Sequence, residues 1–202
     1  MKKDETHIKV EEPVADYGSY SYADYLTWEF EGMIELIKGR IFKQTVAPRV
    51  NHQRVVGNIF NKLYLFLQGK PCEVFVAPFD VRLPVKSKKH EDVDTVVQPD
   101  ICVICDPEKI DEFGCVGPPD LIIEILSPGN NKKEITYKYE VYEAAGVKEY
   151  WLVHPNECTL LVYTLVNGCY QSSKLLTFGE AVRSKAVDGF TLELDTVFEG
   201  IN

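Results

Sequence analysis

Two carboxylates stand inside short apolar runs of this sequence, where a charge is costly unless it is paired or bound to a metal. Asp100 lies in VVQPDICVICD, and Glu124 lies in PPDLIIEILSP. If the two runs form neighbouring strands, facing positions lie about 5 Å apart, so both carboxylates could hold one divalent cation. Such a cation stabilises charge on a phosphodiester and can activate water. We therefore expect a metal site built on Asp100 and Glu124.

Both carboxylates also have less specific explanations. Asp100 follows a proline and could be a turn residue, and Glu124 could lie on the exposed face of an edge strand. A second Pro-Asp pair ends at Asp120, but four residues of strand span roughly 13 Å, too far for Asp120 and Glu124 to share one small ion. We prefer Asp100 as the partner of Glu124 and expect Asp120 to be a turn residue where its strand begins.

Lys138 is the third candidate. It lies three residues after Ile135 and four before Tyr142, so on a helix it shares a face with apolar neighbours. From that face a lysine could reach a site beyond the end of the preceding strand and position or polarise water. An exposed pair with Glu134, four residues earlier, explains the lysine equally well from the sequence alone.

Three further polar residues could assist the site. Glu35 stands in an early hairpin and His52 opens a long helix. Either could be a metal or water ligand, although surface and capping roles are more common for such residues. Gln98 lies two residues before Asp100 on the expected strand, so the two side chains should face the same way.

The hydrophobic pattern predicts the elements that carry these residues. The first part of the chain should form a short helix over 22–30 behind a Ser21–Asp24 capping box, a hairpin over 33–47 turning at Lys38-Gly39, and a helix over 51–68 capped by Asn51. The middle should form a strand over 72–84 bent at Pro78, strands over 96–105 and 120–127, and a helix over 134–145 ended by Gly146. A strand over 149–154, a hairpin around Asn167-Gly168 and a last short strand within 189–198 should follow. This order predicts an α/β (α+β) fold with a mixed central sheet and helices on its faces.

Composition sets the broad class. The 202 residues are 45% hydrophobic, which is enough for one core, so we expect a flexible tail over 1–18 and a single domain over 19–202. No run approaches the roughly 20 apolar residues that span a bilayer, and the first residues do not resemble a signal peptide, which predicts a cytoplasmic protein. A formal net charge of −9 argues weakly against a broad nucleic-acid surface, but a bound cation can offset that repulsion locally.

The six cysteines do not form a metal-binding pattern. Cys102 and Cys105 are spaced as C-x-x-C, but they fall in an expected strand, where this separation directs side chains to opposite faces. No second close pair completes a zinc site. We therefore expect buried free thiols rather than a disulfide or zinc.

Together the motifs resemble the bacterial putative restriction endonuclease family with a PD-(D/E)XK nuclease core. The resemblance spans about Tyr22 to Phe198 and rests on IELIKGRIF, the early His52, VVQPDICVICD, PPDLIIEILSP, KEITYKYEVYEAAGV and EYWLVHP. It implies a restriction-endonuclease-like sheet flanked by helices, with an added N-terminal hairpin and a small C-terminal β extension. It also implies a DNA endonuclease dependent on Mg²⁺, with Mn²⁺ as a substitute, in which Asp100 and Glu124 are the metal ligands.

The resemblance assigns the lysine as well. Leu126 stands where the ordinary motif has its lysine, and Lys138 matches the lysine that this family carries on the following helix. Two departures affect no expected ligand: Glu134 stands where an aspartate is common, and His154 replaces a frequent aspartate. A homodimer would suit cleavage of two strands. The alternative is a nuclease fold that binds nucleic acid or a protein partner without cutting.

Overall fold

The computed structural model describes residues 19–29, 32–44, 48–84, 87–127 and 132–201. The tail expected over 1–18 lies outside this part of the chain. Among the described residues, no helix combines the length and apolar character needed to cross a membrane.

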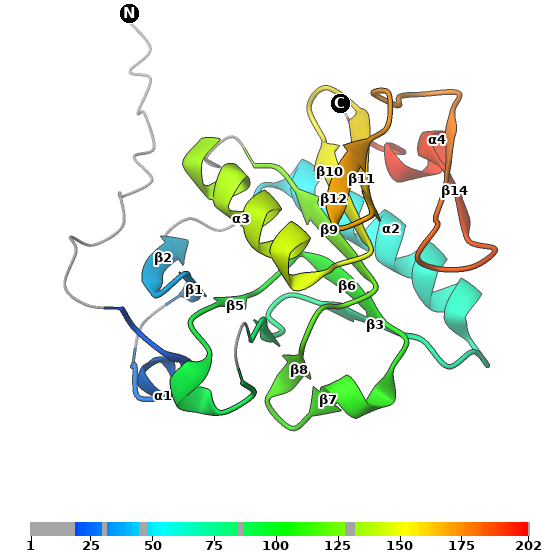
Figure 1. Cartoon of the computed structure of the whole chain (residues 1–202). Coiled ribbons are helices and arrows are strands. Elements are labelled where there is room, and N and C mark those ends of the chain that lie inside the picture. Colours follow the sequence, from blue (N-terminus) through cyan, green and yellow to red (C-terminus); the bar gives the residue numbers. More distant parts are fainter. Residues whose placement is uncertain (1–18, 30–31, 45–47, 85–86, 128–131, 202) are drawn as a thin grey trace, which may run out of the picture.

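Two six-stranded sheets form the framework (Figure 1). The first contains β1 (Met33–Ile37), β2 (Arg40–Gln44), β4 (Val81–Arg82), β5 (Val96–Val97), β7 (Ile110–Asp111) and β8 (Gly114–Val116) in the order β2-β1-β5-β4-β8-β7. The second contains β3 (Glu73–Val76), β6 (Ile101–Ile104), β9 (Leu121–Ile125), β10 (Glu149–His154), β11 (Thr159–Val166) and β12 (Cys169–Ser172) in the order β12-β11-β10-β9-β6-β3. A separate pair joins β13 (Ala181–Arg183) to β14 (Thr191–Glu193).

The helices are α1 (Tyr22–Tyr25), α2 (Val50–Leu67), α3 (Lys132–Ala145) and α4 (Leu194–Val197), with 3₁₀ turns η1 (His90–Asp92) and η2 (Pro107–Lys109). Figure 1 shows α3 in front of the second sheet and α2 behind it. The predicted α+β fold, with mixed sheets flanked by helices, is confirmed.

β9 is the central strand for the candidate site. It runs parallel to β10 and antiparallel to β6, so it has a neighbour on each side. Alternate side chains point to opposite faces: Ile123 packs in the core cluster that contains α2 residues, whereas Ile122 packs in the cluster that contains Tyr142 of α3. Glu124 shares the parity of Ile122 and therefore faces α3.

Two predicted strands each divide between the two sheets. The segment predicted over 96–105 forms β5 in the first sheet and β6 in the second, and residues 98–100 carry the chain across. Pro99 suits this crossing because it has no N–H to donate to a ladder. The segment over 72–84 divides in the same way into β3 and β4, and the Ala77–Pro78 peptide bond between them is cis.

Helix termini agree only in part with the expected caps. The Ser21–Asp24 capping box is present, although α1 ends at Tyr25 rather than near residue 30. The N-cap of α2 is Arg49, without a side-chain hydrogen bond, so the prediction of Asn51 as the cap is wrong. The last predicted strand is divided between β14 and α4.

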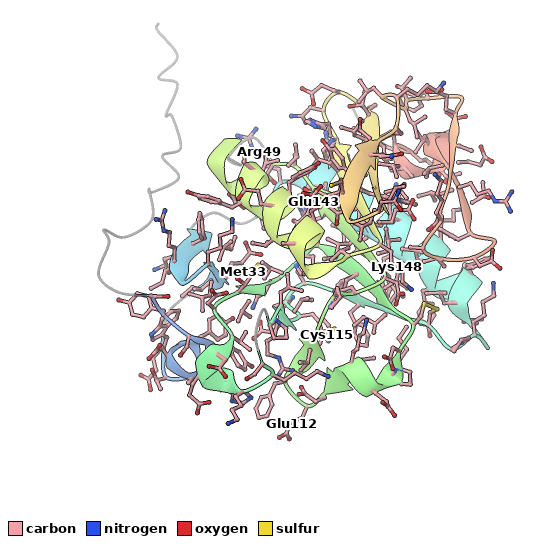
Figure 2. All side chains as sticks on the ribbon, viewed as in Figure 1. Met33, Arg49, Glu112, Cys115, Glu143 and Lys148 are labelled. Atoms are coloured by element: carbon pink, nitrogen blue, oxygen red, sulfur yellow. A yellow bond between two sulfur atoms is a disulfide. The ribbon has the colours of Figure 1, made fainter. Side chains whose placement is uncertain are left out.

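The prediction for the cysteines is wrong at one pair. Cys72 and Cys105 form a disulfide, drawn in yellow in Figure 2, which ties the chain before β3 to the end of β6. Distance along the chain hid this pair, because β3 and β6 become neighbours only through their antiparallel ladder. Cys102 and Cys115 are buried free thiols, as expected.

Glu149, at the start of β10, anchors the C-terminal extension. Its Oε2 accepts hydrogen bonds from the Ser184 hydroxyl at 2.6 Å, the Lys185 N–H at 2.9 Å and the Ala186 N–H at 3.0 Å. The carboxylate is almost fully buried, so these three donors replace water at Oε2, while Oε1 has no hydrogen-bond partner among the described residues. They attach the loop between β13 and β14 to the second sheet.

Candidate active site

Glu124 and Lys138 meet beneath α3. The Lys138 Nζ lies 2.9 Å from the Glu124 Oε1 and 2.9 Å from the Glu35 Oε1. Glu124 is 8% exposed and Lys138 7% exposed. These positions rule out both simpler explanations, because Glu124 lies on a central strand and Lys138 is buried within an ion-pair network.

Asp100 faces Glu124 across the β6–β9 ladder. The register pairs Ile101 with Ile123, so Asp100, one residue before β6, stands opposite Glu124. Its Oδ2 accepts a hydrogen bond from the Ile125 N–H at 2.7 Å. The strands therefore bring together the two carboxylates that the sequence singled out as metal ligands.

His52 lies beside Asp100 rather than at the surface. It is in the first turn of α2 and is 5% exposed, and its Nε2 lies 3.2 Å from the Asp100 Oδ1. Among the described residues, its Nδ1 has no hydrogen-bond partner. The first turn of α2 is thus directed at the metal-ligand candidate from the opposite side of the sheet to α3.

Glu35 links the N-terminal hairpin to the site. Besides its contact with Lys138, its Oε1 accepts a hydrogen bond from the Gln98 N–H at 2.7 Å. The hairpin, expected as an addition to the nuclease core, therefore contributes a buried carboxylate to the site itself.

Gln98 does not share a strand with Asp100, so that prediction is wrong: the chain is crossing between sheets at this point. Its backbone contacts Glu35, while its side-chain Nε2 donates to the Asp80 Oδ1 at 2.7 Å and the Tyr25 hydroxyl at 3.2 Å. The Tyr25 hydroxyl also lies 3.1 Å from the Asp80 Oδ1. Gln98 thus joins the site to a second polar cluster.

Three members of this network were missed from the sequence: Tyr142, Asp80 and Tyr25. The hydroxyl of Tyr142 donates to the Glu124 Oε1 at 2.6 Å. Tyr142 was placed on the Lys138 face but counted as an apolar neighbour. Asp80 could have been found in the same way as Glu124, because it is also a carboxylate in an apolar run. No feature of the sequence singled out Tyr25.

Asp120 lies at the other end of β9 from Glu124. Its Oδ2 accepts from the Cys105 N–H at 2.7 Å, and its Oδ1 lies 2.6 Å from the Lys148 Nζ. These contacts anchor Asp120 directly before β9, where the sequence predicted a turn residue.

Burial and crowding control the charges in the site. Burial raises the pKa of Glu124 to about 8, and the carboxylates of Asp100 and Glu35 add to the rise while Lys138 opposes it. For Lys138, burial lowers the pKa, but Glu124 and Glu35 outweigh burial and hold the pKa well above its ordinary value. Lys138 is therefore protonated at neutral pH.

The donor set suits a hard divalent cation. Carboxylate oxygens are the ligands that Mg²⁺ and Mn²⁺ prefer, and Mg²⁺ is commonly held by one or two carboxylates with waters and substrate phosphate completing its shell. Repulsion from Asp100 and Glu35 adds to the rise that burial causes in the pKa of Glu124, and a bound cation would relieve that repulsion. Within the described part of the chain, no three His, Cys, Asp or Glu side chains are grouped as ligands of one ion, so the fit is to a cation held by Asp100 and Glu124 alone.

Figure 2 labels one residue on each of two elements that carry the site. Met33 marks the start of β1, and Glu143 lies on α3. These two elements meet where Glu35 contacts Lys138. The site is therefore enclosed by α3 and the N-terminal hairpin.

Comparison with known proteins gives a consistent picture. Residues 22–195 match the profile of the Uma2 family, described as "Putative restriction endonuclease". A search of curated proteins gives no match. Among solved structures, the fold is similar to the crystal structure, at 1.96 Å resolution, of a putative nuclease belonging to DUF820 from Anabaena variabilis ATCC 29413. That similarity has a TM-score of 0.69 at 21% sequence identity and covers 89% of this chain and 97% of the other.

Proposed function

The chain belongs to the Uma2 family of putative restriction endonucleases, and on this basis we propose that it is a metal-dependent endonuclease that hydrolyses phosphodiester bonds of DNA. The observation that carries the proposal is the convergence of Asp100, Glu124 and Lys138 from separate segments into one buried site. A core with no chemical role would rarely bury this many charges, because desolvating each one is costly.

Asp100 and Glu124 would hold the cation, with Mg²⁺ proposed and Mn²⁺ as a substitute. A divalent cation supplies positive charge that stabilises the developing charge on a phosphate and makes water more acidic. His52 and the Ile125 N–H each contact one oxygen of Asp100 and fix the orientation of its carboxylate. Glu35 pairs with the ammonium group of Lys138.

Lys138 would act as a cation and hydrogen-bond donor, not as a base. Its pKa is raised by the neighbouring carboxylates, which outweigh burial, so it keeps its proton at neutral pH. An ammonium has three donors, and the contacts with Glu35 and Glu124 use two of them. The third is free, in this proposal, to position or polarise the attacking water or to contact the scissile phosphate.

A second candidate function is a nuclease fold that binds a partner without cutting. The net charge of −9 favours it, as does the ion pairing of Lys138, which already compensates part of the negative charge in the site. Cation binding distinguishes the two functions, since a binding module has no need of a metal site.

Supercoiled plasmid incubated with Mg²⁺ or Mn²⁺ tests the proposal. We expect the wild type to nick the plasmid in the presence of either cation and to lose this activity in EDTA. Glu124→Gln and Asp100→Asn should reduce cleavage by roughly a hundredfold or more, and Lys138→Met by a similar factor. Each replacement keeps the approximate size of the native side chain.

Glu140→Gln is the matched control. Glu140 lies on the same helix as Lys138, is exposed and pairs with Lys38, so this variant should cleave like the wild type. Cleavage that survives Glu124→Gln would overturn the assignment of this site. Absence of both cleavage and cation binding in the wild type would favour the non-cutting module. A homodimer would place two sites on two strands, and sedimentation velocity measures whether one forms.

A further inference from the structure

Two donors on α3 share one oxygen of Glu124. The Tyr142 hydroxyl lies 2.6 Å and the Lys138 Nζ 2.9 Å from the same Oε1. Residues four apart occupy the same helix face, so α3 presents both donors together. Among the described residues, no hydrogen bond to the second oxygen of Glu124 is found.

The tyrosine is the more rigid of the two donors. Its side chain is fully buried, and its ring packs edge-on against Tyr150, with 5.2 Å between ring centroids. Tyr150 in turn stacks on Tyr163 at 5.6 Å. The Tyr142 carbonyl also accepts hydrogen bonds from the Gly146 and Val147 N–H groups that end the helix. Backbone and ring are therefore both fixed, and the position of the hydroxyl follows from them.

Lys138 alone could not fix the carboxylate in this way. Its Nζ lies 2.9 Å from Glu35 as well as 2.9 Å from Glu124, and its long side chain has more rotatable bonds than a tyrosine. A lysine shared between two acids can follow either of them. The Tyr142 phenol contacts Glu124 from a tightly packed ring, so it cannot move toward a second acid in this way.

We propose that Tyr142 is a positioning residue that holds the Oε1 of Glu124 against α3 and leaves the second oxygen directed to the divalent cation. This inference rests on the proposed function, since it gives Tyr142 a role only if Glu124 binds a cation. It adds a residue that the sequence pattern did not single out. Partners that orient metal ligands in this way typically change metal affinity by roughly ten- to a hundredfold.

Titration of the metal-free protein with Mn²⁺, followed by calorimetry and by the electron paramagnetic resonance of free Mn²⁺, tests the inference. Tyr142→Phe removes the hydroxyl and keeps the ring, so the aromatic packing remains. We expect it to bind Mn²⁺ roughly tenfold or more weakly than the wild type. At saturating Mn²⁺ its cleavage rate should recover toward that of the wild type, which Glu124→Gln should not do.

Tyr150→Phe is the matched control. It removes a hydroxyl from the same buried stack, but among the described residues the hydroxyl that donates to Glu124 is that of Tyr142. We expect Tyr150→Phe to bind Mn²⁺ like the wild type. Near-ultraviolet circular dichroism and the Tm of each variant establish that the fold is retained.

The outcomes separate the inference from the function on which it rests. If the wild type binds no Mn²⁺, both are overturned. If the wild type binds Mn²⁺ and Tyr142→Phe binds it equally well, the role of Tyr142 is overturned and the metal-dependent nuclease remains. Equal losses in Tyr142→Phe and Tyr150→Phe would also overturn it, because the effect would then come from the aromatic stack.

Discussion

The site places several negatively charged side chains close to one another. Glu35, Asp100 and Glu124 bring three carboxylates to one buried place, and Lys138 is the lysine that contacts two of them. The protein compensates this excess with neutral donors, namely the Tyr142 hydroxyl and the backbone N–H groups of Gln98 and Ile125. The pH at which Glu124 ionises is therefore a property of the whole cluster.

We predict that, in the absence of metal, the stability of the wild type falls relative to that of Glu124→Gln as the pH rises from about 5 to 8. Burial raises the pKa of Glu124 from 4.5 to about 8 in the folded protein. Between these values the folded state holds a proton that the unfolded state has released. Because the unfolded state then binds fewer protons, the free energy of unfolding decreases with pH.

Urea unfolding of both proteins at several pH values measures this effect. Glutamine cannot ionise, so Glu124→Gln lacks this pH-dependent contribution to the free energy of unfolding. The raised pKa of Lys138 keeps that residue charged throughout the range, so its contribution does not change. Parallel stability curves for the two proteins would contradict the prediction.

The sequence singled out Asp100, Glu124 and Lys138 but missed Asp80 and the hydroxyl groups of Tyr25 and Tyr142. Asp100 and Glu124 stood out because a carboxylate in an apolar run needs a partner. A tyrosine in such a run needs no explanation, since its ring is well suited to a core. The role of Tyr142 depends on Glu124 of β9, a contact that only the packing of α3 on the sheet creates.

At the scale of elements, the site is positioned where the chain crosses from one sheet to the other. Asp100 faces Glu124 because the chain leaves β5, passes through residues 98–100 and enters β6. The pattern of apolar residues predicted a strand here but not its division, because Val96–Val97 and Ile101–Ile104 are equally apolar in either arrangement. Long patterned elements such as α2 and α3 were predictable, and the short first-sheet strands β7 and β8 were not.

The contact between Glu149 and the 184–186 segment should make a large contribution to stability. We predict that Glu149→Ala lowers the free energy of unfolding by roughly 2–5 kcal/mol, because the buried Ser184 hydroxyl and two partly buried N–H groups lose their acceptor. Denaturant unfolding measures this. Glu140→Ala, which breaks an exposed ion pair with Lys38, should cost less than about 1 kcal/mol. Equal losses in the two variants would show that Glu149 is not an anchor.

The disulfide gives a prediction about covalent structure. Peptide mapping of the unreduced protein should recover Cys72 linked to Cys105, with Cys102 and Cys115 as free thiols. Replacing Cys72 by Ser should lower the free energy of unfolding by roughly 2–4 kcal/mol under oxidising conditions and by much less in reductant. A Cys72 peptide recovered as a free thiol would contradict the pairing.

For the molecule as a whole, the acidic charge sets a condition on the proposed binding of DNA. With a net charge of −9, the protein should repel phosphate until a cation offsets the carboxylates of the site. We predict that its affinity for a short DNA duplex rises roughly tenfold or more on adding Ca²⁺ to protein kept in EDTA. Fluorescence anisotropy measures the affinity, and Glu124→Gln should weaken the response to Ca²⁺. Equal affinity with and without the cation would count against a cation-dependent DNA site.

The contact between Glu35 and Lys138 also constrains the order in which the chain can fold. The β1–β2 hairpin leaves the ribosome before α3, so its buried glutamate meets its lysine only after α3 has been synthesised. β1 likewise pairs with β5, which comes much later than β2. Such long-range contacts slow folding because the loop must close before they form. The hairpin can therefore form early but should dock late, and slow docking would delay completion of the proposed catalytic site until both β5 and α3 have been made.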